Sequence, residues 1–397
     1  MRLSFKELDK IKKKYGVDTL WSFSRFDSYR TSHYEYFLKY ILKAKPLSKT
    51  DSAYAPIGGA VHDILENFYT GKTAYQEMIK EFEDVWTVNV DTLGFTFNKD
   101  DNDKDKSIGD KYYKDLQHFF THYNSIGSSV ACETFVPIKI TDDIVFQGYI
   151  DAVYKDADGF YNIVDYKTST MYSGKAIDDH AAQLVLYSEG LHQMGVPKDK
   201  IKCCWNFLKY VSVDYQQVNG KIATSHIERC LLGEKMVSKA KVWLKKLGYL
   251  NQSDELLTEM VATNSLDCLP DDVREKFTVR DCYIYVDDIF EKFEELKEEI
   301  INTIMLINNK TGEYQFSHDD HVFWDDEETC KKQSYYFSNL SDYSIDQLKP
   351  YKEYIDKLER EKNDPLGMGF GSANNFGSSV GAVEADDDDL SWLKDLV

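Results

Sequence analysis

The chain contains the stretch Ile144-Val-Phe-Gln-Gly-Tyr-Ile-Asp-Ala-Val-Tyr154, and Phe160-Tyr-Asn-Ile-Val-Asp-Tyr-Lys167 follows it after a short polar break. Both segments are rich in β-branched and aromatic residues, which favour β-strands. The break between them, Asp156-Ala-Asp-Gly159, has the composition of a tight turn. The stretch therefore predicts a β-hairpin, and the rest of the fold can be worked out from it.

The turn also predicts which residues of the hairpin face each other. A three-residue loop that ends in a left-handed Gly159 is a common hairpin type. Counting back from such a loop places Asp151 opposite Asp165, where like charges destabilise a sheet. We therefore expect a cation between the two carboxylates, with Lys167 on the same strand face as Asp165. The alternative is an ordinary surface hairpin with a solvated polar face.

Composition limits the class of protein. The 397 residues are 42% hydrophobic and 14% aromatic, which indicates a folded globular protein. No apolar run approaches the roughly 20 residues that cross a membrane, and the charged N-terminal segment is unlike a secretory signal. The seven cysteines are scattered without a C-x-x-C pair, which argues against zinc ribbons and disulfide frameworks. We expect a cytoplasmic protein, bacterial or phage-encoded in a host cell.

The net charge of −20 argues against broad, non-specific adhesion to nucleic acid. Lysines nevertheless gather within residues 6–14, 39–49 and 235–246. Each of these runs is either a solvated helix face or part of a local nucleic-acid contact.

Residue periodicity predicts the order of the elements. Strand-like segments at 131–140 and 202–213 flank the hairpin, and a helical pattern at 176–194 lies between the hairpin and the last strand. Further helical patterns cover 4–15, 25–43, 56–70, 74–90, 108–124, 231–247, 287–307 and 344–362. We expect an α/β fold, with a mixed β-sheet core flanked by helices and additional helical elaborations.

Two helical segments carry polar pairs at one-turn spacing. His62 and Glu66 follow Gly58-Gly59, and Gln183 and Tyr187 occupy the predicted crossover helix. Histidine is a common metal ligand. Taken alone, each pair also fits an ordinary amphipathic helix.

Five motifs occur in a fixed order: S-x-S-R-F-x-x-Y at 22–29, G-x-x-x-H-x-x-L-E at 58–66, G-Y-I-D at 148–151, D-Y-K-T at 165–168 and Q-L-x-x-Y at 183–187. Together they resemble the PD-(D/E)XK nuclease superfamily, in particular the RecB-type nuclease domain and the CRISPR-associated RecB-like exonucleases. The resemblance covers residues 21–187. It implies a restriction-endonuclease-like core.

The resemblance assigns metal and catalytic roles. It implies that His62, Asp151, Asp165 and the main-chain carbonyl of Tyr166 bind Mg²⁺ or Mn²⁺, which suit an oxygen-rich site. Catalysis would involve Asp151, Asp165, Lys167 beside the scissile phosphate, and Glu66 in support of His62. Substrate binding would involve Ser24, Arg25, Gln183 and Tyr187.

Many relatives also hold an iron–sulfur cluster with one early and three late cysteines. The early cysteine would fall near Ser32, and the late region contains only Cys330. Because such clusters require four thiolates, we expect none here.

The C-terminal sequence predicts a protein partner. A Gly- and Ser-rich linker at 363–385 leads to an acidic tail at 386–397, which carries Leu390, Trp392, Leu393 and Leu396. The tail is either a solubilising segment or a docking peptide for a helicase, single-strand-binding or replication protein. It could also fold back and compete with DNA. The chain has no G-x-x-x-x-G-K-[ST] loop, so unwinding of duplex DNA would need a partner.

The sequence thus predicts a metal-dependent DNA nuclease, an exonuclease acting on DNA ends or single strands in recombination, repair or replication. Region 1–55 would be helical, 56–230 the nuclease core, and 231–362 a mainly helical region that completes it. The alternatives are a structure-specific or nicking endonuclease, a non-catalytic scaffold that binds partners through its tail, and an acidic inhibitor that mimics DNA.

Overall fold

The computed structural model describes residues 2–47, 52–97, 108–127, 129–324, 343 and 348–363. The chain forms two compact units, Met1–Ser344 and Ile345–Val397. The second unit contributes one described helix, α14 (Lys349–Asn363). The predicted docking residues Leu390, Trp392, Leu393 and Leu396 lie outside the described residues. Among the helices that are described, none has the length and apolar character needed to span a membrane.

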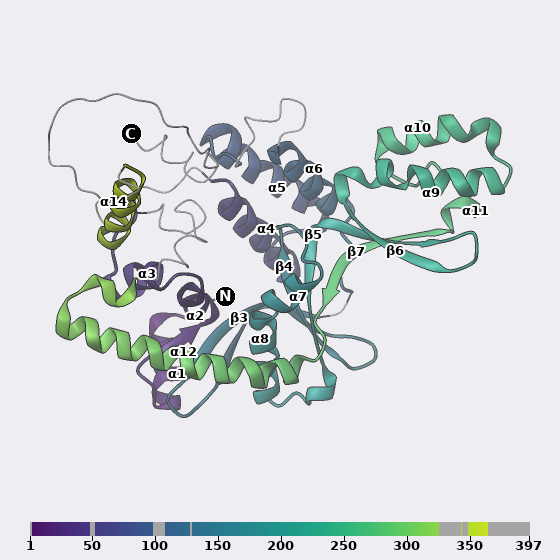
Figure 1. The fold of residues 1–397 in the computed structure, drawn as a ribbon. Coiled ribbons are helices and arrows are strands. Elements are labelled where there is room, and N and C mark those ends of the chain that lie inside the picture. The colour runs from purple at the N-terminus through teal and green to yellow at the C-terminus, as the bar shows by residue number, and fades with distance from the viewer. Residues whose placement is uncertain are drawn as a thin grey trace, which may run out of the picture. The chain divides into compact units, whose positions relative to one another are not determined.

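A seven-stranded mixed sheet forms the centre of the first unit (Figure 1). Its main path runs β1-β3-β4-β5-β6, with β2 paired to β3 and β7 paired to β5. The pairs β1–β3 and β4–β5 are parallel, and the others are antiparallel. The strands are β1 (Leu20–Ser22), β2 (Val130–Lys139), β3 (Val145–Lys155), β4 (Tyr161–Lys167), β5 (Ile201–Gln216), β6 (Ile222–Glu228) and β7 (Phe277–Tyr285). This architecture confirms the expected α/β fold.

The hairpin between β3 and β4 has the predicted register. Ala152 pairs with Val164. One residue further along each strand, the same register sets Asp151 opposite Asp165. Gly159 adopts the left-handed conformation, with φ of 85°. The loop is closed by the Asp156 side chain, whose Oδ1 accepts hydrogen bonds from the backbone N–H groups of residues 158 and 160.

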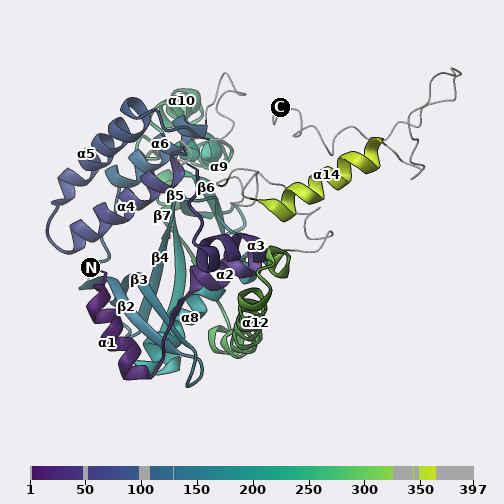
Figure 2. The same ribbon diagram turned by 90° about the vertical axis from the view of Figure 1, so that its left-hand side faces the viewer.

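Helices cover both sides of the sheet (Figure 2). α4 (Tyr54–Tyr69), α5 (Tyr75–Trp86) and α6 (Ile108–Thr121) lie on one side, and α8 (Ala182–Gln193), with α12 (Ile289–Ser317) packed on it, lies on the other. Neighbouring strand residues point to opposite faces. Accordingly, Cys204 is buried in the core under α4 and α6, whereas the thiol of Cys203 contacts Ser188 of α8.

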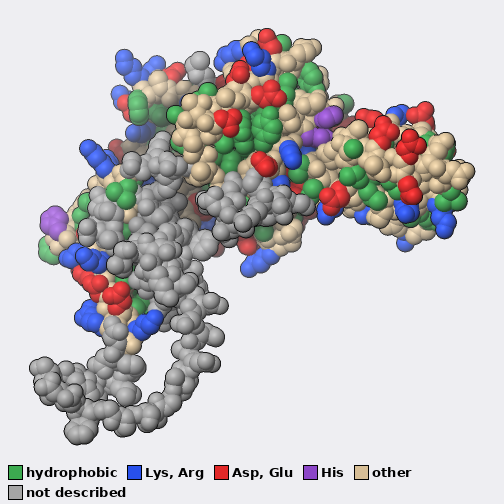
Figure 3. All heavy atoms as spheres, turned by 90° about the horizontal axis from the view of Figure 1, so that it is seen from above, with side chains coloured by type: hydrophobic (Ala, Val, Ile, Leu, Met, Phe, Trp, Pro, Cys, Tyr) green, Lys and Arg blue, Asp and Glu red, His purple; other side chains and the backbone are tan. Residues whose placement is uncertain are grey.

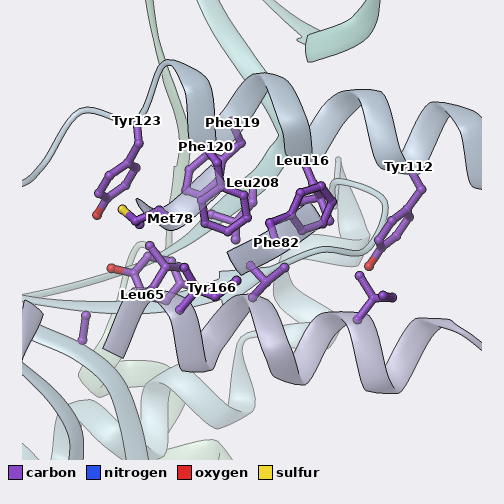
Figure 4. Close-up of a cluster of buried hydrophobic side chains, with 14 of the residues drawn as sticks. Leu65, Met78, Phe82, Tyr112, Leu116, Phe119, Phe120, Tyr123, Tyr166 and Leu208 are labelled. Carbon is purple, nitrogen blue, oxygen red and sulfur yellow. The ribbon is translucent and has the colours of Figure 1, made fainter. Parts of the chain in front are cut away.

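The core under α4, α5 and α6 is largely aromatic (Figure 4). Phe82, Phe119 and Phe120 are fully or almost fully buried there, and Tyr166 of β4 reaches the same cluster. A helix layer that buries such large rings against the sheet fixes the position of α4. This matters for the site, because α4 carries His62.

A helical insert lies between β6 and β7. It comprises α9 (Leu232–Lys246), α10 (Ser253–Thr263) and α11 (Asp271–Arg274). Its buried residues, among them Met236 and Trp243, form one hydrophobic cluster with residues of β5, β6 and β7. Arg229, which is 2% exposed, ties the insert to the sheet by pairing with Asp281 of β7 at 2.5 Å. Seen from above, acidic and basic side chains both cover this part of the protein (Figure 3).

The remaining elements are short or peripheral. α1 (Phe5–Tyr15), α2 (Phe23–Thr31), α3 (His33–Tyr36) and a π-helix at Phe37–Leu42 occupy the N-terminal region, where helices were expected. A second π-helix, Thr87–Thr92, extends α5, and α7 (Lys175–His180) precedes α8. Short 3-10 turns lie at Lys198–Lys200, Arg229–Leu231, Leu250–Gln252 and Asp320–Phe323.

Candidate active site

A cavity of about 880 Å³ opens where β3, β4, α4, α8 and the start of α2 meet. It gathers side chains that are widely separated in the sequence. Eight of the residues predicted from the sequence line it: Ser24, His62, Glu66, Asp151, Asp165, Lys167, Gln183 and Tyr187. The fold thus brings the predicted metal, catalytic and most of the predicted substrate residues into one place.

His62 is held between the two strands of the hairpin. Its Nδ1 lies 3.5 Å from Oδ2 of Asp151, and its Nε2 lies 3.0 Å from the carbonyl oxygen of Tyr166. The same Oδ2 accepts a hydrogen bond from the Tyr166 N–H at 2.9 Å. Burial lowers the pKa of His62, but the hydrogen bond and charge of Asp151 outweigh burial and raise it overall. His62 therefore contacts two of the other three predicted metal donors, the Asp151 carboxylate and the Tyr166 carbonyl.

Asp165 and Lys167 form a close ion pair on β4. Lys167 Nζ lies 2.7 Å from Asp165 Oδ2, and the Asp165 side chain is only 7% exposed. Burial holds the pKa of Asp165 above its ordinary value, and the charge of Lys167 opposes this effect. Burial lowers the pKa of Lys167, but Asp165 more than compensates, so the amine remains protonated at neutral pH.

Gly148 allows α8 to close against β3. A Cβ atom at this position would lie 2.3 Å from Cε1 of Tyr187, so no other residue fits without displacing the ring. The Tyr187 hydroxyl accepts a hydrogen bond from Gln183 Nε2 at 2.9 Å, one turn earlier on the same helix. Burial raises the pKa of Tyr187 to about 12, which keeps the phenol neutral. The motif glycine and the helix pair thus form one wall of the cavity.

The first motif divides between the cavity and the core. Ser24 lines the cavity, and its Oγ lies 3.1 Å from Oγ of Ser22. The guanidinium of Arg25 instead lies 4.2 Å from the Trp21 ring centroid and donates hydrogen bonds to the Tyr36 hydroxyl. Arg25 therefore stabilises the start of α2 through aromatic contacts, and its predicted role in substrate binding stays a prediction.

Comparison with known families identifies this arrangement. A family model described as the PD-(D/E)XK nuclease superfamily matches residues 20–330. The chain belongs to the PD-(D/E)XK nuclease superfamily. A comparison with curated proteins finds no significant match.

The superfamily generally uses divalent metals, and the donor chemistry of this cavity suits them. Asp151 and Asp165 supply carboxylate oxygens, Tyr166 supplies a carbonyl oxygen, and His62 supplies a nitrogen. Across the described ranges, no three His, Cys, Asp or Glu residues are already arranged as a metal site. In the structure, the hydrogen bonds between His62, Asp151 and Tyr166 occupy the atoms that would coordinate the ion.

The iron–sulfur prediction depends on two positions. Ser32, which stands where an early cysteine would fall, caps α3 by accepting a hydrogen bond from the Glu35 N–H. Cys330 lies outside the described residues.

Sequence reasoning missed several residues of this PD-(D/E)XK site. The cavity is also lined by Arg2, Asp27, Asp63 and Glu133. Asp63 could have been suspected because it directly follows His62. Asp27 occupies an unspecified position of the motif at 22–29. Arg2 and Glu133 have no local signal, because the chain brings them in from the segment before α1 and from β2. The lining contains six carboxylates, at Asp27, Asp63, Glu66, Glu133, Asp151 and Asp165, and two cationic side chains, at Arg2 and Lys167.

Proposed function

We propose that this PD-(D/E)XK nuclease is a deoxyribonuclease dependent on Mg²⁺ or Mn²⁺. The observation that carries the proposal is the convergence of His62, Asp151, Asp165 and Lys167 on one cavity. An excess of carboxylates would repel a DNA phosphate, so a cation is needed before a phosphodiester can enter. The RecB-like motif order supports placement in that branch and action as an exonuclease.

The metal would be held by His62, Asp151, Asp165 and the carbonyl of Tyr166. When bound, such an ion polarises a phosphoryl oxygen and lowers the pKa of a bound water. The hydrogen bond from the Tyr166 N–H orients the Asp151 carboxylate toward His62. Glu66, one helical turn after His62, lines the same cavity and would support the imidazole.

Lys167 acts as a fixed positive charge in this proposal. Its ion pair with Asp165 keeps the amine protonated, so it would orient the attacking water and balance the charge that develops on the phosphate. A protonated amine is a poor general base. The geometry therefore favours charge stabilisation by Lys167 over proton abstraction.

Gln183 and Tyr187 would place the DNA strand. Their side chains are linked by a hydrogen bond and are held rigidly by the close approach of Tyr187 to Gly148. Ser24, which lines the same cavity, would contact the same strand, and Arg25 would support it. A rigid wall of this kind positions a phosphodiester with little loss of side-chain entropy.

A nuclease assay with Mg²⁺ or Mn²⁺ tests the proposal on the full chain. We expect Asp165→Ala and Lys167→Ala each to reduce cleavage at least roughly a hundredfold. Asp158→Ala, in the exposed hairpin turn, is the matched control and should retain activity. Unchanged cleavage by both site variants would refute the assignment. End-labelled linear and closed circular DNA in the same assay separate exonuclease from endonuclease action.

The acidic tail would recruit a helicase, single-strand-binding or replication protein, so that the nuclease reaches DNA in recombination, repair or replication. Four aspartates beside Leu390, Trp392, Leu393 and Leu396 support a docking peptide steered by charge. Deletion of residues 384–397 tests this idea. Loss of partner binding at an unchanged cleavage rate supports docking, whereas faster cleavage indicates that the tail inhibits the enzyme.

A further inference from the structure

Arg2 lies at the edge of the cavity, although the motifs give it no role. It lines the cavity together with Asp151 and Asp165. Its guanidinium lies 5.7 Å from the Tyr149 ring centroid, and the backbone N–H of Leu3 donates a hydrogen bond to the Tyr149 hydroxyl at 2.9 Å. The segment before α1 is therefore anchored to β3 beside the candidate catalytic residues.

Glu133 is the partner of Arg2, and an uncommon backbone conformation places it there. The residue lies in β2 between Cys132 and Thr134. These two pair with residues 152 and 150 of β3, which flank Asp151. Its φ of 46° is in the left-handed region, which a non-glycine residue seldom adopts within a strand. Such strain persists where surrounding contacts enforce it, and it is concentrated at functional sites. Here it accompanies a carboxylate that lines the catalytic cavity.

The ion pair between these two residues is weak and easily exchanged. Arg2 Nε lies 3.4 Å from Glu133 Oε2, and the Arg2 side chain is 78% exposed while that of Glu133 is 16% exposed. Because the Arg2 end is exposed to solvent and the separation is long, the pair contributes little to stability. This contact uses one edge of the guanidinium, which has five donors in a planar fork that matches phosphate oxygens.

The other cation of the cavity is already engaged. Lys167 lies 2.7 Å from Asp165, in a pair that is largely buried. A DNA strand that enters this cavity therefore meets one exposed cationic side chain, Arg2, among the residues that line it. Since Arg2 is loosely held, it can turn from Glu133 toward a phosphate at little cost.

We propose that Arg2 binds a backbone phosphate of the DNA strand next to the scissile one, and that Glu133 holds Arg2 in place until the strand arrives. The inference rests on the proposed function, because it assumes that DNA occupies this cavity. Arg2 is then a positioning residue. Glu133 competes with the substrate for the same guanidinium, which gives the two residues opposite effects on DNA affinity.

The test measures the affinity of the full chain for a fluorescein-labelled single-stranded oligonucleotide by anisotropy at several salt concentrations, with Ca²⁺ in place of Mg²⁺ so that a divalent cation can occupy the carboxylate-rich cavity. Arg2→Ala should weaken binding roughly tenfold. This is the loss expected for one hydrogen bond to a charged group, at the lower end of the energies usual for such bonds. The substitution should also reduce the slope of log K against log salt by about 0.7. Glu133→Gln should tighten binding. Arg274→Ala, which breaks the exposed pair of Arg274 with Asp271 outside the cavity, is the matched control.

Steady-state cleavage with Mg²⁺ provides the second readout. Arg2→Ala should raise KM far more than it lowers kcat, and Arg2→Lys should restore part of the loss. Binding that is unaffected by Arg2→Ala overturns the inference. So does a loss of affinity in Glu133→Gln, because it would mean that the pair only supports the local structure. Wild-type protein that cleaves no DNA would instead refute the proposed function, and the binding measurements with Ca²⁺ would still decide the role of Arg2.

Discussion

Replacing Gly148 with alanine is the sharpest perturbation of the site, because one methyl group acts on a defined contact. The added Cβ would lie 2.3, 2.9 and 3.3 Å from three atoms of the Tyr187 ring. These distances are too short for carbon atoms, so the ring has to move. Tyr187 is 7% exposed and sits on a helix that is packed against β2, β4 and β5. It therefore has little room to rotate away.

The cost can be worked out from two contributions. Overpacking of a well-packed interior costs typically about 1–3 kcal/mol. Displacement of the ring also strains the hydrogen bond between the Tyr187 hydroxyl and Gln183, which has a net value of about 0.5–1.5 kcal/mol. We therefore expect Gly148→Ala to lower the free energy of unfolding by about 2–4 kcal/mol.

Urea unfolding of the full chain, followed by tryptophan fluorescence, measures this change. Gly59→Ala is the control, because Gly59 lines the same cavity but an added Cβ would meet no atom within 4 Å. In the helix interior of α4, that substitution should stabilise the protein by roughly 0.5–1 kcal/mol. DNA cleavage by Gly148→Ala should also fall. Gly148 is only three residues before Asp151 on the same strand, so displacement of the Tyr187 ring also disturbs the cavity beside Asp151.

A double substitution tests whether the contact with Tyr187 is the cause. Tyr187→Leu removes the ring, so Gly148→Ala should cost much less in that background than in the wild type. The coupling energy between the two positions should be at least about 1 kcal/mol, as for other contacting residues. If the two substitutions are additive, or if Gly148→Ala is as harmless as Gly59→Ala, the steric reasoning is wrong.

Three further predictions concern stability. Burial raises the pKa of Asp115 from 3.8 to about 6, so the folded state binds a proton that the unfolded chain releases. Stability should therefore fall as pH rises through this interval, and Asp115→Asn should remove that slope in urea titrations. Arg229→Ala should cost about 3–5 kcal/mol, because it leaves Asp281 buried without its partner. Glu133→Gly should raise the thermal midpoint by relieving roughly 1 kcal/mol of backbone strain, whereas Glu133→Gln should not.

Local turn chemistry made the hairpin predictable. The sequence Asp156-Ala-Asp-Gly159 allows few loop types, and Gly159 takes the left-handed position that the three-residue loop requires. Once the loop is fixed, the period of two along each strand sets Asp151 against Asp165. The crossover helix was predictable from the residue periodicity at 176–194, and in the structure it supplies the long connection that parallel β4 and β5 need.

Features that depend on distant parts of the chain were not predictable. β7 pairs with β5 from Cys204 to Tyr215 after an insert of three helices, and the composition of β7 does not reveal which distant strand it joins. Arg2 and Glu133 are 131 residues apart in the sequence. The left-handed conformation of Glu133 also has no signal in its residue type, since glutamate seldom adopts it.

The negative charge of the chain and of its cavity decides under which conditions DNA can enter the candidate site. A net charge of −20 and six carboxylates around the candidate site oppose the entry of DNA. Before a metal binds, Lys167 offsets little of this charge, because its ion pair with Asp165 already neutralises it. A divalent cation bound by Asp151 and Asp165 would change the sign of the local field where the proposed function places the scissile phosphate. Metal and DNA would then strengthen each other's binding by the same factor, because coupling between two ligands is reciprocal. Such coupling would confine strong DNA binding to the metal-loaded site, even though most of the protein surface repels the strand.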